Sequence, residues 1–212
     1  MGMRYELGYK NKSRSLIVRS AAAQLRAKGV EAVRLADMMR AAGMTNGGFY
    51  KHFDSKDEIV AEAIGCALAE VADQLLSKVQ GLPRGKALRA VIEFYLSEEH
   101  LRHPERGCAI AALGSELARM SLNMKRRVSG ALQAYEERLL YLMPGDSDLQ
   151  RRTAFLVLFS SMAGCLTAAR AEVDDQKRRS ILTAGLAFFA RAFCRTDSGV
   201  LQESWQRTKK HS

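Results

Sequence analysis

The chain has 212 residues, of which 47% are hydrophobic and only three are proline, so it is long enough to bury a core and fits a largely helical protein of one or two domains. Its net charge of +10 is uneven: residues 1–56 hold 11 Lys or Arg against 4 Asp or Glu, whereas residues 57–212 hold 22 against 19. The basic N-terminal quarter favours a polyanionic partner, although a membrane surface or plain solubility would give the same balance.

Two further features argue against secretion and membrane insertion. The four cysteines lie far apart with no paired spacing, and no secretory signal opens the chain, so we expect free thiols and a cytoplasmic location. The longest uncharged run, residues 153–169, is short for a membrane span and contains serine, threonine and glycine. We interpret it as a buried helix.

The first predicted helix runs from Ser13 to Lys28, with Gly29 as its stop signal. Ile17, Ala21 and Leu25 give it one apolar side at helical spacing. Residues 1–12 lack such a pattern, and we expect them to be either a flexible basic arm or a disordered terminus.

A short helix follows at residues 35–42. Leu35, Met38 and Met39 share one side of it, and Gly43 can end it in a left-handed backbone conformation. No Ser, Thr, Asp or Asn stands directly before it, because Arg34 occupies the cap position.

The next helix begins after a tight turn, which makes a helix-turn-helix pattern. Thr45 can cap it with its hydroxyl, residues 46–48 form an exposed first turn, and Phe49 and Phe53 point inward. A helix presented by its N-terminal end suits the major groove of DNA. The adjacent glycines indicate either a close approach to DNA or merely a poor first turn.

The residues at 41–56 follow the pattern Ala-Ala-Gly-Met-Thr-x-Gly-x-Phe-Tyr-x-His-Phe-x-Ser-Lys, which resembles the signature of the TetR family of bacterial transcriptional regulators. The detailed resemblance covers about residues 13–65. It implies an all-α fold, with a three-helix DNA-binding head in residues 1–56 and a ligand-binding and dimerisation domain in residues 57–212. A long helix would join the two.

The resemblance also implies which residues contact double-stranded operator DNA. Bases would lie nearest Thr45, Asn46, Gly47 and Gly48, and phosphates nearest Tyr50, Lys51, His52 and Lys56. The family usually has Ser or Thr where Val33 and Arg34 stand. Arg34 therefore either adds a cation near the phosphates or weakens the helix start by about 1 kcal/mol.

A capping box at Ser55 and Glu58 predicts a long helix to about Gln80, which Gly81 and Pro83 stop. In the resembled family this helix transmits the ligand signal to the head. Further helices are predicted at 84–100, 106–121, 124–142, 148–171 and 175–193, and residues 196–212 as a loose tail.

The last two helices carry more apolar surface than one thin domain can cover, so we expect them either to form a homodimer interface or to belong to the core. In the resembled family they form a four-helix interface, whose two-fold symmetry matches a palindromic operator. The predicted interface residues are Phe155, Phe159, Met162, Leu166, Leu182, Leu186 and Phe189.

Residues 84–142 are rich in apolar side chains with few charges, which predicts a mostly apolar small-molecule effector or, equally, a filled core. The predicted ligand-binding residues are Phe94, Cys108, Leu113, Leu117 and Tyr135. Residues 106–113 resemble a Gly-Cys motif of one TetR branch in which some members sense electrophiles. Cys108 would then lie at a helix start near Arg102 and Arg106, unless it is an inert buried thiol.

Catalytic and metal-binding motifs are absent, with no Ser-His-Asp spacing, Walker loop, GxGxxG or HExxH, so we expect neither an enzyme nor a cofactor. His100, His103 and Cys108 have a zinc-like spacing without a fourth ligand, and a surface helix end is the preferred interpretation. The sequence predicts a ligand-responsive regulator, with repression favoured. The alternatives are an architectural DNA-binding protein, or a helical carrier or enzyme with a structural head.

Overall fold

The computed structural model describes residues 2–194, with side chains for residues 11–83 and 85–194. All regular structure in this part is helical, which confirms the predicted all-α class. The elements are α1 (Gly2–Lys28), α2 (Leu35–Ala41), the 3-10 helix η1 (Asn46–Lys51), α3 (Lys56–Val79), α4 (Arg84–Tyr95), α5 (Glu98–Arg102), η2 (Pro104–Arg106), α6 (Ala109–Arg119), α7 (Leu122–Leu139), η3 (Leu140–Leu142), α8 (Asp148–Ala171) and α9 (Asp175–Phe193). The predicted tail at 196–212 lies outside the described residues.

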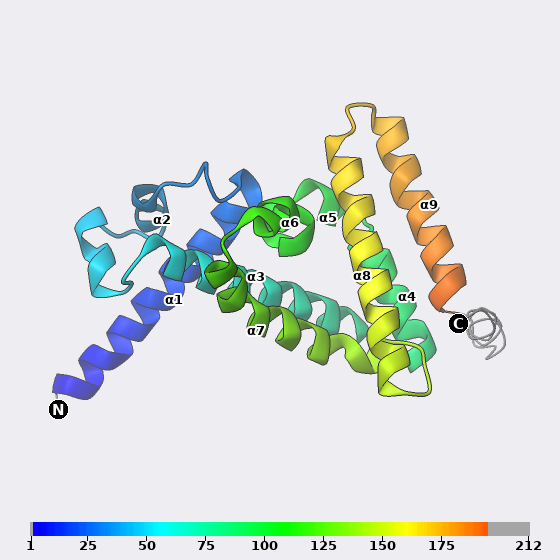
Figure 1. Ribbon diagram of the computed structural model, residues 1–212, viewed down its shortest axis with the longest axis horizontal. Helices are drawn as coiled ribbons and strands as arrows, with labels where there is room; N and C mark the ends of the chain where they lie inside the picture. The colour runs from blue at the N-terminus through cyan, green and yellow to red at the C-terminus, as the bar shows by residue number, and fades with distance from the viewer. Residues whose placement is uncertain (1, 195–212) are drawn as a thin grey trace.

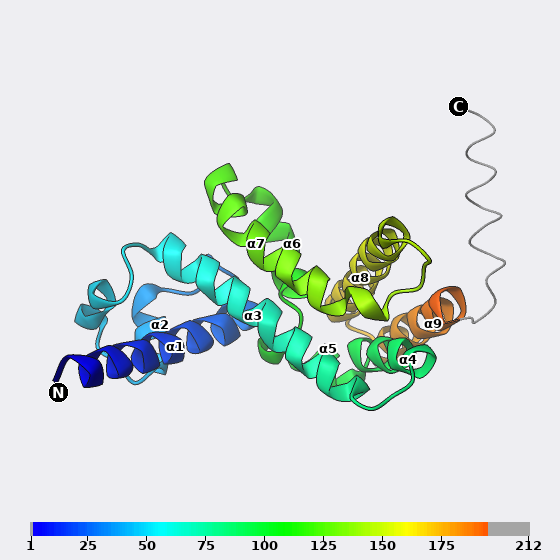
Figure 2. The ribbon, with the colours of Figure 1, turned by 90° about the horizontal axis from the view of Figure 1, so that it is seen from below.

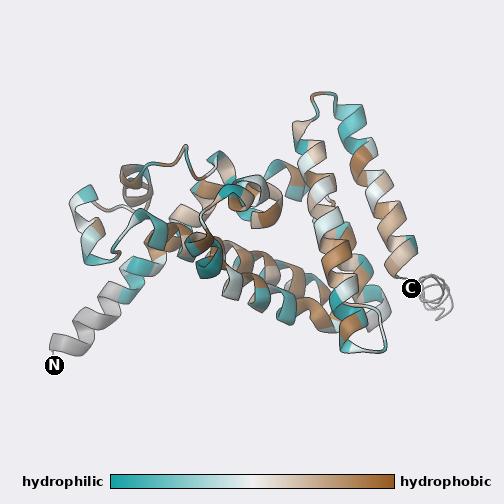
Figure 3. Cartoon of the chain, in the orientation of Figure 1, coloured by the Kyte–Doolittle hydropathy of each residue, from teal (hydrophilic) through white to brown (hydrophobic). Residues whose placement is uncertain are grey.

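The helices form an elongated subunit with a head at one end and a helical hairpin at the other (Figures 1 and 2). The head contains α1, α2, η1 and the start of α3, and the hairpin is α8 with α9. The long helix α3 runs from the head into the second part, where it packs along α7 and against α4. Hydrophobic residues follow α3 along most of this path (Figure 3).

The N-terminal segment differs from its prediction, because α1 begins at Gly2 instead of near Ser13. A helix that is already formed gains one backbone hydrogen bond for each residue added, so weak apolar periodicity does not stop it from extending. Residues 2–12 contain no proline, the strongest helix breaker.

The start of α3 follows its predicted cap only in part. Ser55 Oγ accepts the N–H of Glu58 at 3.2 Å, as a capping box requires. The carboxylate of Glu58 instead accepts the N–H of Asp54, one residue before the cap, at 2.6 Å. The cap therefore also holds the turn that joins η1 to α3.

Helix boundaries between residues 84 and 142 were predicted less well than those after residue 147. The expected helix at 84–100 is split, because Ser97 caps a separate α5 by accepting the N–H of His100 at 3.1 Å. Likewise α6 starts at Ala109, and α7 ends at Leu139 before a 3-10 turn. The predicted bounds of α8 and α9 are confirmed.

An aromatic cluster fills the centre of the second part. Tyr95 from α4, Tyr135 from α7, and Phe155 and Phe159 from α8 contact one another, with Phe155 and Phe159 stacked at 4.6 Å between ring centroids. All four are buried. The hairpin is thus anchored to α4 and α7 through one side of α8.

By length and composition α8 could cross a membrane, the one described helix of which this is true. Its inner side is buried among other helices of the subunit. The interpretation of residues 153–169 as a buried helix therefore holds for one side of α8 only, because Leu156 and Val157 on its other side are exposed.

Candidate functional site

The turn between α2 and η1 has the predicted geometry. Gly43 has φ 73°, the left-handed value that ends α2, and the N–H of Met44 returns to the carbonyl of Met39 at 2.9 Å. Phe49 and Phe53 are each 1% exposed and stack on each other at 5.4 Å. These two rings anchor η1 in the head and leave its first turn outside.

Ion pairs and one cation–π contact hold η1 and α3 against α1. The Arg14 guanidinium lies 4.2 Å from the centroid of the Phe53 ring. The same group donates to Glu58 at 2.7 Å and also to Glu62. The position of η1 is therefore fixed by α1 as well as by its own turn.

The predicted second helix of the helix-turn-helix is a 3-10 helix, η1, rather than an α-helix, and its predicted cap is wrong. Thr45 occupies the N-cap position, but its side chain makes no cap hydrogen bond. The N–H of Gly48 bonds instead to the Thr45 carbonyl at 3.1 Å, which closes a tighter turn. Two glycines favour neither helix form strongly, so the anchoring of Phe49 and Phe53 decides the local geometry.

The predicted DNA contacts lie largely on the surface. Gly48 and His52 are half-buried, and His52 is the C-cap of η1. The exposed members are Arg34, Thr45, Asn46, Gly47, Tyr50, Lys51 and Lys56. Arg34 takes the cap position of α2 without a side-chain hydrogen bond, as its chemistry predicts.

The two glycines of η1 are not required by the protein's own packing. A Cβ added to Gly47 would meet no atom within 4 Å, and one added to Gly48 would make ordinary contact with Met39 Cε at 3.6 Å. Neither glycine has a positive φ. The open space before η1 is therefore available to a molecule outside the subunit.

Residues 17–63, which span the helix-turn-helix and the start of α3, match the family described as bacterial regulatory proteins, tetR family. The head therefore matches the model of this family, and the match ends at residue 63. A comparison with curated proteins gave no match.

Solved structures share the fold over most of the chain. A TetR transcriptional regulator from Chloroflexus aurantiacus is 20% identical, with a TM-score of 0.68 over 86% of this chain and 94% of its own. NemR of E. coli, in its reduced form, is 15% identical, with a TM-score of 0.70 over 88% and 99%. FadR of Bacillus subtilis, in complex with stearoyl-CoA, is 17% identical, with a TM-score of 0.61 over 83% and 97%. The protein thus has the fold of TetR-family transcriptional regulators.

The residues predicted to bind an effector lie in the core of the second part of the chain, which follows the head and which we call the regulatory part after its predicted role. Cys108, Leu113 and Tyr135 are buried, and Phe94 and Leu117 are half-buried. The Tyr135 hydroxyl is buried without a hydrogen-bond partner among the described residues, and the buried Tyr95 hydroxyl has the Cys108 thiol as its neighbour. Burial raises the pKa of both phenols. The two hydroxyls mark a polar spot in an otherwise apolar core.

Cys108 is the N-cap of α6 and is 2% exposed. Its N–H donates to His100 Nε2 at 2.9 Å, and His100 Nδ1 lies 2.7 Å from the Tyr95 carbonyl. The imidazole therefore carries its proton on Nδ1 and accepts at Nε2. Burial lowers the pKa of His100 to about 4, so the ring is neutral at pH 7.

Two expectations around Cys108 were wrong. His100 is 4% exposed and belongs to the core instead of a surface helix end. Arg102 and Arg106 turn outward and pair with Glu98 and Glu105. No group of metal-ligating side chains occurs among the described residues.

The junction between the head and the regulatory part contains two interactions that the sequence did not predict. The buried Arg26 side chain pairs with Glu70 at 2.6 Å and donates to the Gly107 carbonyl at 3.3 Å, directly before α6. Near the other end of α6, Glu116 accepts the N–H of Val30 at 2.7 Å. In each of these interactions the two partners lie far apart in sequence, so no local sequence pattern predicts the contact.

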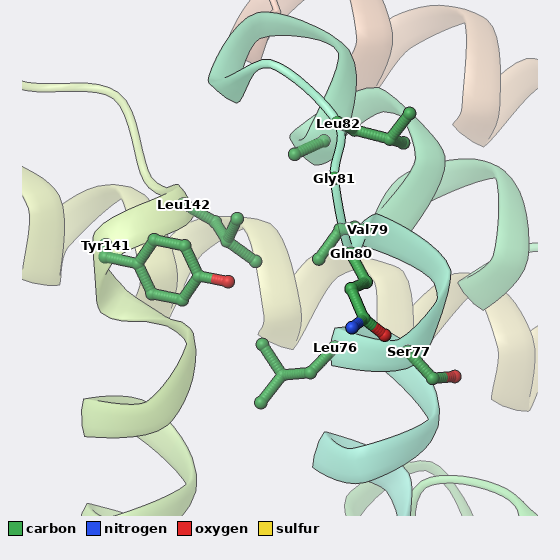
Figure 4. A pocket seen from close by; sticks show the side chains of 9 residues that line it. Leu76, Ser77, Val79, Gln80, Gly81, Leu82, Tyr141 and Leu142 are labelled. Atoms are coloured by element: carbon green, nitrogen blue, oxygen red, sulfur yellow. The ribbon is translucent and has the colours of Figure 1, made fainter.

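A surface cleft of about 600 Å³ lies at the far end of α3, away from the head. Leu76, Val79 and Gln80 of α3 form one side, and Tyr141 and Leu142 of η3 face them (Figure 4). The predicted ligand-binding residues do not line it.

The residues predicted for the dimer interface are mostly core residues. Leu186 is half-buried, and the other six, Phe155, Phe159, Met162, Leu166, Leu182 and Phe189, are buried inside the subunit. The opposite sides of the same helices are exposed and apolar, with Leu156 and Val157 on α8 and Phe188 on α9. Helical periodicity identified the apolar helices, but both sides of α8 are apolar, so the pattern did not say which side is covered.

Proposed function

We propose that the protein is a ligand-responsive transcriptional regulator that acts in the cytoplasm as a repressor, binds a palindromic operator as a homodimer and has no catalytic role. The observation that carries this proposal is the head, in which two buried phenylalanines anchor η1 while its first turn remains exposed. That arrangement suits entry of the N-terminal end of η1 into a major groove.

Contacts to DNA divide by chemistry. Tyr50, Lys51 and Lys56 have the hydroxyl and cationic groups that bind phosphate, and they flank the exposed turn of η1. Asn46 carries an amide that can read a base edge, and Gly47 lets the backbone approach closely. The phosphate contacts would set affinity and the base contacts would set sequence preference.

The dimer would form through the exposed sides of α8 and α9. Besides Leu156, Val157 and Phe188, these sides carry small residues that allow close helix packing, among them Ser160, Gly164, Ala184 and Ala187. A two-fold axis through such an interface repeats the head, and the spacing of the two heads would then select the spacing of operator half-sites.

Release from DNA follows from linkage. The protein would have two arrangements, one that fits the operator well and one that fits it poorly. An effector lowers operator affinity by the ratio of its own affinities for these two arrangements, and by no more. The two ends of α6 contact the end of α1 and the loop after it, through Arg26 and Glu116. Movement of α6 would therefore reach the helix-turn-helix directly.

The effector is a mostly apolar small molecule or an electrophile that acts near Cys108. Support comes from the buried Tyr95 and Tyr135 hydroxyls, which offer polar anchoring beside Cys108 inside an aromatic shell. Among proteins of the same fold, FadR of Bacillus subtilis was solved with stearoyl-CoA. Cys108 stands at the start of α6 and is buried in the same core.

Selection of a random-sequence duplex pool on the purified protein tests the proposal. We expect enrichment of a palindrome whose half-sites are protected in footprinting. Loss of enrichment in an Asn46→Ala, Lys51→Ala double variant would assign the binding to η1. If the pool stays random and the wild type and the double variant retain the same amount of DNA, the result would favour the alternative function, a helical small-molecule-binding protein whose head is structural.

A further inference from the structure

The turn between α6 and α7 carries positive charge that the subunit does not neutralise. Residues 117–135 contain four cations, Arg119, Lys125, Arg126 and Arg127, and no Asp or Glu. All four are exposed, and none forms an ion pair within the described part of the chain. We name these four residues the α7 basic cluster.

Other arginines of the regulatory part behave differently. Arg89, Arg102 and Arg106 each pair with a glutamate of their own segment, and Arg138 and Arg152 pair with carboxylates of neighbouring helices. The α7 basic cluster therefore stands out because four exposed cations without ion pairs gather in one short segment that contains no acidic residue, although single exposed cations are not rare.

The local backbone adds to the positive potential. Ser121 caps α7 by accepting the N–H of Met124 at 3.2 Å, and the first turn of this 18-residue helix contains no acidic side chain. The N-terminal end of a helix carries partial positive charge, so the helix and its cations act in the same direction on an anion.

The α7 basic cluster lies at the end of the regulatory part that faces the head. Helix α7 runs parallel to α3: a Cβ on Gly65 would lie 3.4 Å from the Ala131 Cβ, and Arg138 pairs with Asp73 at 2.6 Å further along. The start of α7 is therefore beside the start of α3, where Lys56 stands (Figure 2).

Two further contacts locate the cluster near the DNA-binding residues. Arg119 lines a surface cleft together with Lys28 and residues 29–32 of the loop before α2. The Nζ of Lys56 lies 3.4 Å from the Val30 carbonyl of the same loop. The Asp54 amide and the Arg14 guanidinium lower the pKa of Glu58, and Arg127 adds a smaller electrostatic effect in the same direction.

We propose that the α7 basic cluster is a second DNA contact, which binds the sugar-phosphate backbone beside the half-site that η1 occupies. This inference rests on the proposed function, since it extends the phosphate-binding surface from Lys56 of α3 to the regulatory part. The partner is the same duplex: exposed cations that form no ion pair within the described residues suit phosphates, and they carry no base-reading geometry.

The experiment compares two double variants that remove the same charge. Arg126→Ala, Arg127→Ala removes two cations of the cluster, and Lys86→Ala, Lys177→Ala removes two exposed, unpaired cations of α4 and α9 elsewhere on the subunit. Affinity for a duplex selected on the wild-type protein is measured between 50 and 200 mM salt. All four substituted side chains are exposed, so melting temperatures should match the wild type.

Each lost phosphate contact reduces the slope of log affinity against log salt by about 0.9. We expect the cluster variant to lose about one to two units of slope, and the Lys86, Lys177 variant to keep the wild-type slope. The preferred sequence should stay unchanged in both, because backbone contacts carry no base information.

Equal slopes in the two variants would overturn this inference while leaving the proposed function intact, and would assign the cluster to another acidic partner or to solvent. A wild-type protein that binds no duplex at any salt concentration would refute the proposed function itself. A changed preferred sequence in the cluster variant would also contradict a backbone-only contact.

Discussion

Val30 donates its backbone N–H to the Glu116 carboxylate at 2.7 Å, which ties the loop before the helix-turn-helix to α6 of the regulatory part. Gly29 makes this approach possible: it has φ 85°, and a Cβ there would lie 2.8 Å from Glu116 Oε1. A side chain at position 29 would therefore have to displace the Glu116 carboxylate from its contact with Val30.

A Gly29→Ala substitution tests this junction. We expect a loss of about 2–4 kcal/mol in the free energy of unfolding, from left-handed backbone strain plus a weakened hydrogen bond to a charged acceptor. Gly81→Ala is the matched control, because Gly81 has φ 77° and open space around it. It should lose only about 1–2 kcal/mol. Equal losses in urea unfolding would show that the Glu116 contact contributes nothing.

The dimer proposal predicts opposite outcomes for neighbouring residues of one helix. Val157→Glu, on the exposed side of α8, should give a folded monomer in light scattering, and Phe188→Glu of α9 should do the same. Phe159→Glu places a charge in the aromatic cluster and should unfold the regulatory part. Folded dimers for both surface variants would exclude this interface.

The buried imidazole of His100 predicts acid sensitivity. Its pKa of about 4 in the folded protein lies below the ordinary value of 6.5, so between these values the unfolded chain binds the extra proton. The free energy of unfolding should therefore fall as pH drops through this window, by up to about 3 kcal/mol.

Urea unfolding at several pH values isolates the contribution of His100. His103→Gln, at a more exposed histidine close by in sequence, should keep the wild-type pH dependence between pH 6.5 and 4. His100→Gln should lower stability at pH 7 but flatten the dependence in this window. An unchanged pH dependence in His100→Gln would mean that other groups cause the acid sensitivity.

The thiols differ in access. Cys108 is buried, whereas Cys66, Cys165 and Cys194 are half-buried and have pKa values that burial raises, for Cys66 to about 11. Cys108 should therefore react slowly with maleimide in the native protein. Once Cys108 is labelled, DNA binding of the wild type should weaken, whereas the same maleimide treatment should leave DNA binding of Cys108→Ser unchanged. Labelling of Cys108 without any effect on DNA binding would make it a packing residue.

Local patterns predicted the elements that local chemistry decides. Gly43 ended α2 in the expected conformation, Ser55 capped α3, and the bounds of α8 and α9 were confirmed because Ser147 and Asp174 cap them directly. The 3-10 form of η1 was missed because the burial of Phe49 and Phe53 fixes the backbone of this short glycine-rich segment, and burial depends on tertiary packing.

Features that depend on distant contacts were the ones the sequence did not reveal. His100 has an ordinary spacing near Cys108, yet only the folded chain shows that it is buried with both nitrogens in use. No local motif marks Arg26 and Glu116, because their partners across the junction are two backbone groups, the Gly107 carbonyl and the Val30 N–H. The covered side of α8 was also undetermined, since apolar residues occur on both of its sides.

The central claim is that η1 inserts its exposed first turn into DNA, and Gly47 tests it most directly. A methyl group there meets no protein atom, so Gly47→Ala should fold with unchanged or slightly higher stability, by at most about 1 kcal/mol. Gly130→Ala of α7, also in open space, is the matched control. Anisotropy titrations with the selected duplex should show at least about ten-fold weaker binding for Gly47→Ala, roughly 1.4 kcal/mol, and wild-type binding for Gly130→Ala. Wild-type affinity in a folded Gly47→Ala protein would contradict the account.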